Sequence, residues 1–254
     1  MNAGDTAFIL LCAAFVFIMT PGLAFFYGGM VRRKNGGNHA GIIGGAKWFG
    51  FNGVGMKPGP YAATIPNLAF AAFQMMFAMI TPALITGSVA GRMKFKALVL
   101  FIILWSLIVY YPMAHMVWGE GGFLAEIGSV DFAGGNVVHI TSGVSGLVLA
   151  LTLGKRRGYD QGAYHVHNTP FVFLGAALLW FGWYGFNGAA CTTIEQLSSV
   201  FVTTTIAPAI ATVTCMIFTW IKYGKPDVSM CLNASLAGLV AITAGCSNVD
   251  AFGS

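Results

Sequence analysis

The chain has 254 residues, of which 57% are apolar and only 8% are charged, and its formal net charge at pH 7 is +5. A soluble globular domain carries about 25% charged residues. The composition therefore excludes a soluble domain of ordinary composition and indicates a protein that crosses a membrane several times. We expect a single membrane domain over residues 1–254.

Seven apolar runs approach the length of about 20 residues that a helix needs to cross a bilayer. Gly and Pro interrupt several of them, which membrane helices tolerate when neighbouring helices satisfy the freed backbone groups. The pattern predicts an all-α, polytopic membrane helix bundle. The predicted spans, of which the last is short, are 7–31, 64–90, 97–118, 134–154, 170–190, 196–221 and 232–247.

Basic residues follow four of these spans, at 32–34, 92–96, 155–157 and 222–225. The connections 119–133 and 191–195 contain acidic residues but no Lys or Arg. Because cytoplasmic connections carry the excess of Lys and Arg, the basic clusters are predicted to be cytoplasmic and the acidic connections to lie outside.

This sidedness conflicts with the number of crossings near the N-terminus. Only the span 64–90 separates the basic clusters at 32–34 and 92–96, although both should be cytoplasmic. The intervening 35–63 connection is rich in Gly and Pro and has no apolar run long enough to cross. Either a spanning helix is missing near residues 35–36 or the connection forms a re-entrant loop, and we favour a missing helix.

Several stretches, in the same order along nearly the whole chain, resemble the ammonium transporter family (Amt/Mep/Rh). Each alone is a weak signal, whereas the ordered set is specific. The stretches are TPGLAFFYGGMVRRKN (20–35), AFQMMFAMITPALIT (72–86), YPMAHMVW (111–118), DFAGGNVVHI (131–140), HN (167–168) before Pro170, WYGFN (183–187), GKP (224–226) and AGLVAIT (237–243).

The resemblance implies a fold of eleven spanning helices in two inverted halves, assembled as a homotrimer in the cell membrane. Against that pattern, the second helix is missing near 35–36, and the last three would follow Ser254. It also implies transport of ammonium or ammonia, with a cytoplasmic PII-type regulator as a candidate partner. We expect no cofactor, metal or nucleic acid, because the five cysteines lack metal-site spacing and no nucleotide motif is present.

Three aromatic residues are candidates for substrate binding. Trp118 lies at the outer end of its predicted span, where an interfacial Trp is common, but Trp is also the best cation–π partner for a small cation. Phe77 and Phe186 are ordinary core residues unless the resemblance is considered. The resemblance matches Trp118 to the outer site of the family and makes Phe77 and Phe186 a stacked gate that strips water from the ion.

His139 lies in an apolar run, where an imidazole is costly and so marks a candidate site. It is either a packing residue bonded to Thr141 or Ser142, or a functional group in a pore. The resemblance makes it one of two facing histidines that relay a proton while neutral ammonia crosses. The partner would belong to the tenth helix of the family, so the relay is incomplete within this sequence.

Asp131 precedes the run that contains His139, and a carboxylate there is expected to cap the helix N-terminus. In the family, the matching aspartate shapes the outer site through its structural role and its electric field, without needing to touch the ion.

Two positions depart from the family pattern. Ala190 replaces a serine that bonds the outer ion, and Gly91 replaces an acidic residue, which should loosen that helix end.

Three alternatives remain open from the sequence. The chain could be a relative that binds or senses ammonium without conducting it. It could be an intramembrane serine protease, because residues 143–146 read GVSG, although His139 lies six residues before Ser145 on the wrong turn for a hydrogen bond. Finally, the sequence could omit residues that the natural protein contains.

Overall fold

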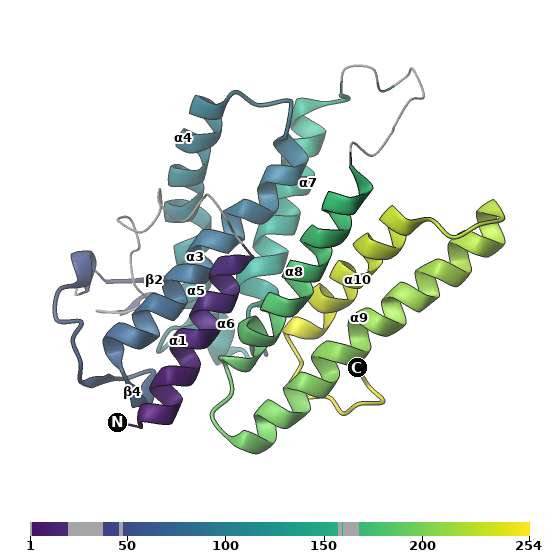
Figure 1. Ribbon diagram of the computed structural model, residues 1–254. Coiled ribbons are helices and arrows are strands. Elements are labelled where there is room, and N and C mark those ends of the chain that lie inside the picture. The colour runs from purple at the N-terminus through teal and green to yellow at the C-terminus, as the bar shows by residue number, and fades with distance from the viewer. Residues whose placement is uncertain (1, 20–37, 46–47, 157–158, 160–167) are drawn as a thin grey trace.

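The computed structural model describes residues 2–19, 38–45, 48–156, 159 and 168–254 (Figure 1). Within these residues the chain is mainly helical, and two of its helices contain π-helical segments. The α-helices are α1 (Ala3–Ile18), α3 (Asn67–Val89), α4 (Phe95–Trp105), α5 (Tyr111–Trp118), α6 (Phe123–Glu126), α7 (Thr141–Leu153), α8 (Thr169–Gly188), α9 (Ile194–Tyr223) and α10 (Val228–Thr243). The π-helices are η2 (Ser106–Tyr110) and η3 (Gly135–Ile140), and η1 (Phe49–Phe51) is a 3₁₀ turn.

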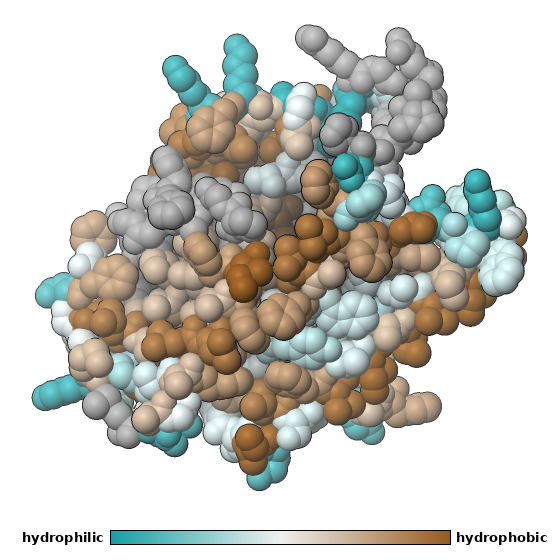
Figure 2. Space-filling view, viewed as in Figure 1, coloured by the Kyte–Doolittle hydropathy of each residue, from teal (hydrophilic) through white to brown (hydrophobic). Residues whose placement is uncertain are grey.

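Among the described residues, five helical segments are long and apolar enough to cross a membrane: 67–89, 95–126, 135–153, 169–188 and 194–223. They coincide with five of the predicted spans, which confirms the polytopic helix bundle. The helix α1 begins at residue 3 and covers residues 7–18 of the predicted span 7–31, of which residues 20–31 fall outside the described residues. Figure 2 shows apolar residues in brown over much of the visible surface, as expected where lipid replaces water.

The last predicted span begins earlier than the apolar pattern indicated. The structure has α10 at 228–243 instead of 232–247, because Asp227 caps its N-terminus. The Asp227 carboxylate accepts a hydrogen bond of 2.8 Å from the Met230 amide. A polar cap lies outside the apolar run, so hydropathy alone places the start of such a helix too late.

The Gly- and Pro-rich connection contains two short antiparallel hairpins that the all-α prediction did not include. β1 (Asn38–His39) pairs with β2 (Ile43–Gly44), and β3 (Pro58–Gly59) pairs with β4 (Ala62–Pro66). The Phe123 amide donates to the Gly41 carbonyl (2.8 Å), and the Asn2 amide donates to the Thr64 carbonyl (2.6 Å). The hairpins therefore pack on the end of the bundle where α1 begins. The helix expected near residues 35–36 falls outside the described residues.

The two ends of the bundle differ in charge. The Arg92 guanidinium donates a hydrogen bond of 2.5 Å to the Gly154 carbonyl and holds the C-terminal ends of α3 and α7 together. The basic connections that follow these two helices therefore meet at one end of the bundle. At the other end, the Phe132 amide donates to the Ala244 carbonyl (2.9 Å) and brings the acidic 119–133 connection to the end of α10. Figure 1 shows the α3–α4 connection and the N-terminus at opposite ends. This arrangement agrees with the sidedness expected from the distribution of Lys and Arg.

Candidate functional site

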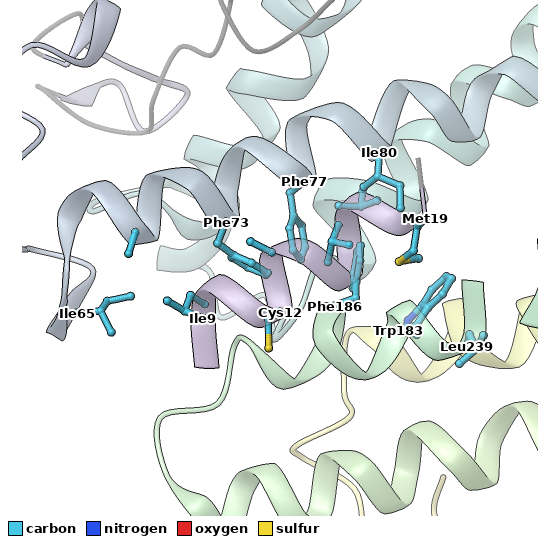
Figure 3. Close-up of a cluster of buried hydrophobic side chains, with 14 residues drawn as sticks. Ile9, Cys12, Met19, Ile65, Phe73, Phe77, Ile80, Trp183, Phe186 and Leu239 are labelled. Atoms are coloured by element: carbon cyan, nitrogen blue, oxygen red, sulfur yellow. The ribbon is translucent and has the colours of Figure 1, made fainter. Parts of the chain in front are cut away.

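Two phenylalanine rings meet between α3 and α8. The ring centroids of Phe77 and Phe186 are 4.2 Å apart, with an angle of 30° between the ring planes. The two side chains are 2% and 0% exposed, within a cluster that draws its residues from α1, α3, α8 and α10 (Figure 3). The structure thus brings together the two residues that the resemblance assigned to a gate.

Trp118 lies against this pair from α5. Its ring is 6.1 Å from that of Phe77 in an edge-to-face arrangement of 72°. Its indole Nε1–H donates to the Asp131 carbonyl (2.7 Å), which fixes the orientation of the ring. Because Trp118 is partly buried and packs against two core clusters, it does more than anchor an interface with lipid headgroups.

The carboxylate of Asp131 caps the segment that carries His139. Its oxygens accept four backbone hydrogen bonds of 2.6–3.0 Å, which satisfy N–H groups that have no partner within the helix. The donors are Gly134, Gly135, Asn136 and Val137. This carboxylate is therefore engaged by the backbone, in the position expected of a helix cap.

Gly134 makes the sharp turn at this cap, with a φ of +117° that favours glycine. A Cβ atom here would lie 3.3 Å from Phe77 and 3.5 Å from Trp118. The turn that begins the His139 segment thus also packs against the two outer aromatic rings.

His139 continues the series of rings from η3. Its imidazole centroid is 5.5 Å from Phe186 and 5.1 Å from Trp183, with interplanar angles of 22° and 17°. The side chain is 8% exposed, and its buried Nε2 atom has no hydrogen-bond partner among the described residues. A buried polar atom without a partner is uncommon and calls for an explanation.

The hydroxyls of Thr141 and Ser142 do not hold the imidazole. Each donates to a backbone carbonyl one turn earlier, at 2.6 Å, to Val137 and Val138 respectively. The reading of His139 as a packing residue bonded to these hydroxyls therefore finds no support in the geometry.

Trp183 is a site residue that sequence reasoning did not select. Figure 3 shows its ring on α8 beside Phe186, and its Nε1–H donates to the Thr243 hydroxyl (2.8 Å). Because residues three apart share a helix face, the spacing of Trp183 and Phe186 within WYGFN was the signal that could have identified it.

The remaining sequence candidates have structural partners. Ser145 of the GVSG stretch accepts a hydrogen bond of 2.8 Å from the Trp105 indole and joins α7 to α4. Ala190 packs against an apolar cluster that includes Cys246. Among the described residues, no group of three or more His, Cys, Asp or Glu side chains could hold a metal ion.

The comparison with known proteins identifies the family. The model of the Ammonium Transporter Family matches residues 7–43 and 40–254. The chain is 44% identical over 284 aligned residues to an ammonium transporter of Bacillus subtilis, an alignment that covers 100% of this chain and 69% of that protein. This chain belongs to the ammonium transporter family. It is a multi-pass membrane protein, as the sequence predicted.

Solved structures of the family share the fold. Mep2 of Saccharomyces cerevisiae matches with a TM-score of 0.87 and 32% identity, over 99% of this chain and 64% of that one. A structure described as a sensor Amt protein matches with a TM-score of 0.83 and 27% identity, over 98% of this chain and 70% of that one. The chain thus spans 64% to 70% of the length of these three relatives.

The Asp131 cap gives the first prediction. Replacing Asp131 with Ala leaves four N–H groups without an acceptor and should lower the free energy of unfolding by about 3 kcal/mol or more. Asp131→Asn keeps one side-chain carbonyl oxygen, so its free energy of unfolding should fall by about half as much as that of Asp131→Ala. Unfolding in mixed detergent micelles measures both values.

The matched control is Asp250→Ala, because the Asp250 carboxylate also accepts two backbone N–H groups but is exposed. This change should alter the free energy of unfolding by less than about 0.5 kcal/mol. Equal losses at positions 131 and 250 would contradict the capping role of Asp131.

Proposed function

We propose that this protein transports ammonium or ammonia across the cell membrane. The observation that carries the proposal is a continuous series of rings, Trp118, Phe77, Phe186 and His139, that ends on an imidazole nitrogen without a partner. The printed names of the relatives support the same substrate. A homotrimer in the cell membrane and a cytoplasmic PII-type regulator belong to this proposal and rest on membership of the family.

Trp118 would recruit the cation at the outer end of the series. The face of an indole attracts a small cation through its quadrupole, and the attraction grows when water is excluded. The hydrogen bond from the indole nitrogen to the Asp131 carbonyl lies at the ring edge and does not itself occupy the aromatic face. The side chain of Ala190 cannot form a hydrogen bond to the ion, as the serine of the family pattern does. Binding of the cation would therefore depend more on the aromatic contacts.

Phe77 and Phe186 would make the ion lose its water. An apolar constriction disfavours an ion that remains charged, because burying a charge without a partner costs many kcal/mol. Ammonia without its proton passes such a barrier at far lower cost. The pair therefore selects for deprotonation at the outer end.

His139 would carry the proton that ammonia leaves behind. An imidazole can accept a proton at one nitrogen and release one from the other. The Nε2 atom of His139 is buried without a partner among the described residues, on a ring whose centroid is 5.5 Å from that of Phe186. In the family pattern a second histidine on the tenth helix completes the relay.

A non-conducting ammonium sensor is the second candidate. It is favoured by the structural match to the protein described as a sensor Amt protein and by the alanine at position 190. Such a protein would bind the cation at the same aromatic rings but would show no transport current.

We also propose that a spanning helix of the family is missing between α1 and β1. The two segments matched by the family model meet at residues 40–43, and the alignment of 284 positions with the Bacillus protein exceeds the 254 residues here. Peptide mapping of the protein purified from its native source should give fragments that read through residues 20–45 as in this sequence. A fragment with about 20 additional apolar residues near residues 35–36 would mean that the natural protein contains the helix.

Substitution of Trp118 tests recruitment. Trp118→Leu should raise the ammonium concentration for half-maximal current about tenfold, the equivalent of a cation–π energy of about 1.4 kcal/mol. Trp118→Phe keeps an aromatic face, so its ammonium concentration for half-maximal current should lie between those of the unaltered chain and Trp118→Leu. Currents recorded on a supported membrane measure the effect.

The matched control is Trp220→Leu, because Trp220 is 59% exposed on α9. Neither this change nor Ser145→Ala should shift half-saturation more than twofold. Saturable binding without any current would overturn transport and favour the sensor. Loss of affinity in Trp220→Leu equal to that in Trp118→Leu would show that the outer rings are not the site.

Substitution of His139 tests the passage of the proton. His139→Phe retains a ring that can stack on Trp183 and Phe186 but removes both nitrogens. It should reduce the ammonium-dependent current at least tenfold and change ammonium affinity less than twofold. An undiminished current in a variant that melts like the parent would rule out the proton-carrying role.

A further inference from the structure

Two cysteines face each other across the hairpin that α9 and α10 form. Figure 1 shows these two helices side by side, and residues 224–227 join them at one end. The thiol of Cys231 on α10 lies within hydrogen-bond reach of the Cys215 thiol and the Thr219 hydroxyl, both on α9. Both cysteines are partly exposed, and neither belongs to the series of rings at the candidate site.

Backbone and hydroxyl hydrogen bonds fix this pairing. The Thr219 hydroxyl donates to the Cys215 carbonyl (2.8 Å) and accepts from the Asp227 amide (3.3 Å). The Cys231 amide donates to the Asp227 carbonyl (3.0 Å). Residues four apart share a helix face, so each cysteine lies one turn beyond the contact between Thr219 and Asp227. Because the two helices are antiparallel, the cysteines meet at the same level of the hairpin.

The backbones of α9 and α10 approach closely further along the hairpin. A Cβ atom on Gly238 would lie 2.7 Å from the Ala207 carbonyl oxygen and 2.9 Å from the Ala211 Cβ. A disulfide requires Cα atoms within about 7 Å of each other, which helices joined by large side chains do not reach. The close packing of this hairpin therefore favours a covalent link between its two thiols.

The position of the pair gives it access to a water-soluble reagent. Cys231 lies in the first turn of α10, beside the connection that carries the exposed Lys222 and Lys225. The bias of Lys and Arg predicts that this connection is cytoplasmic, where thiols are normally kept reduced. By contrast, Cys12 and Cys246 are only 2% and 0% exposed. The hairpin thus presents two adjacent thiols at a surface where reduced and oxidised small thiols occur.

We propose that Cys215 and Cys231 form a redox-active dithiol, which reacts with a small-molecule disulfide and becomes an intramolecular disulfide between α9 and α10. The Cys231 thiolate attacks one sulfur of the small disulfide, whose S–S bond breaks and releases one small thiol. The Cys215 thiolate then attacks the Cys231 sulfur and displaces the second small thiol. The two cysteines lose two protons and two electrons in total, and the two released small thiols take them up. An excess of small thiol reverses both steps.

Oxidation of the full chain by glutathione disulfide tests this proposal. The protein is reduced in detergent micelles, freed of reductant and exposed to glutathione disulfide. Free thiols are then alkylated with N-ethylmaleimide, and the digested peptides are weighed. A linked peptide that contains Cys215 and Cys231 should appear, lighter by two hydrogen atoms than its two parts. Alkylation of both cysteines should fall about tenfold and recover with excess reduced glutathione.

Single variants separate the two steps. Cys215→Ser removes the thiol that resolves the mixed disulfide, so Cys231 should accumulate bound glutathione about tenfold above its level in the unaltered chain. The matched control is Cys191→Ser, because Cys191 is also partly exposed but lies at the other end of the bundle. It should change the yield of the linked peptide less than twofold.

Three outcomes would overturn the proposal. The first is that Cys231 holds as much glutathione in the unaltered chain as in Cys215→Ser, with no linked peptide. The second is that Cys215 or Cys231 links to a different cysteine or to a second molecule. The third is that neither thiol reacts in the folded protein, although both react after unfolding in sodium dodecyl sulfate.

Discussion

One residue, Asp131, holds together the two halves of the candidate site through its carboxylate and its backbone carbonyl. Asp131 accepts four backbone N–H groups at the start of η3, while its carbonyl accepts the indole N–H of Trp118. The same residue therefore orients the outermost ring of the series and begins the segment that carries His139. Within a membrane, unsatisfied N–H groups cost several kcal/mol each, so the π-helical start of this segment depends on that cap.

The site itself is almost entirely aromatic. From Trp118 to His139 the rings approach one another at centroid distances of 4.2–6.1 Å, and the inner members are buried. Such surroundings offer few polar groups that could replace the hydration shell of an ion. The imidazole is the first group in the series able to exchange a proton. The proposed division between recruitment at Trp118 and proton transfer at His139 rests on this order of side chains.

The polar residues of the bundle have two different roles. Those within the spans bond to their own helix, and those at the helix ends join neighbouring helices. Within the spans, hydroxyl groups mostly donate to carbonyls of their own helix, as Thr81 does to Phe77 (2.6 Å), next to Pro82 inside α3. At the C-terminal ends of α3 and α7, Arg92 and Arg156 donate to carbonyls of a neighbouring helix end. Long side chains that reach across helix ends join elements distant in sequence and concentrate positive charge at one membrane surface.

The sequence by itself determined the membrane class, five of the spans and the family, because apolar runs and ordered motifs are one-dimensional signals. The bias of Lys and Arg adds a prediction of sidedness. It also selected Trp118, Phe77, Phe186, His139 and Asp131, through motifs that a resemblance could match. Only the tertiary structure decided that the rings of Phe77 and Phe186, 109 positions apart in the chain, meet at 4.2 Å. It alone revealed Trp183 beside His139, the hairpins of the Gly- and Pro-rich connection and the crossed bridges of Arg92 and Arg156. Contacts between distant segments depend on how helices cross and rotate about their axes, and hydropathy carries no information on either.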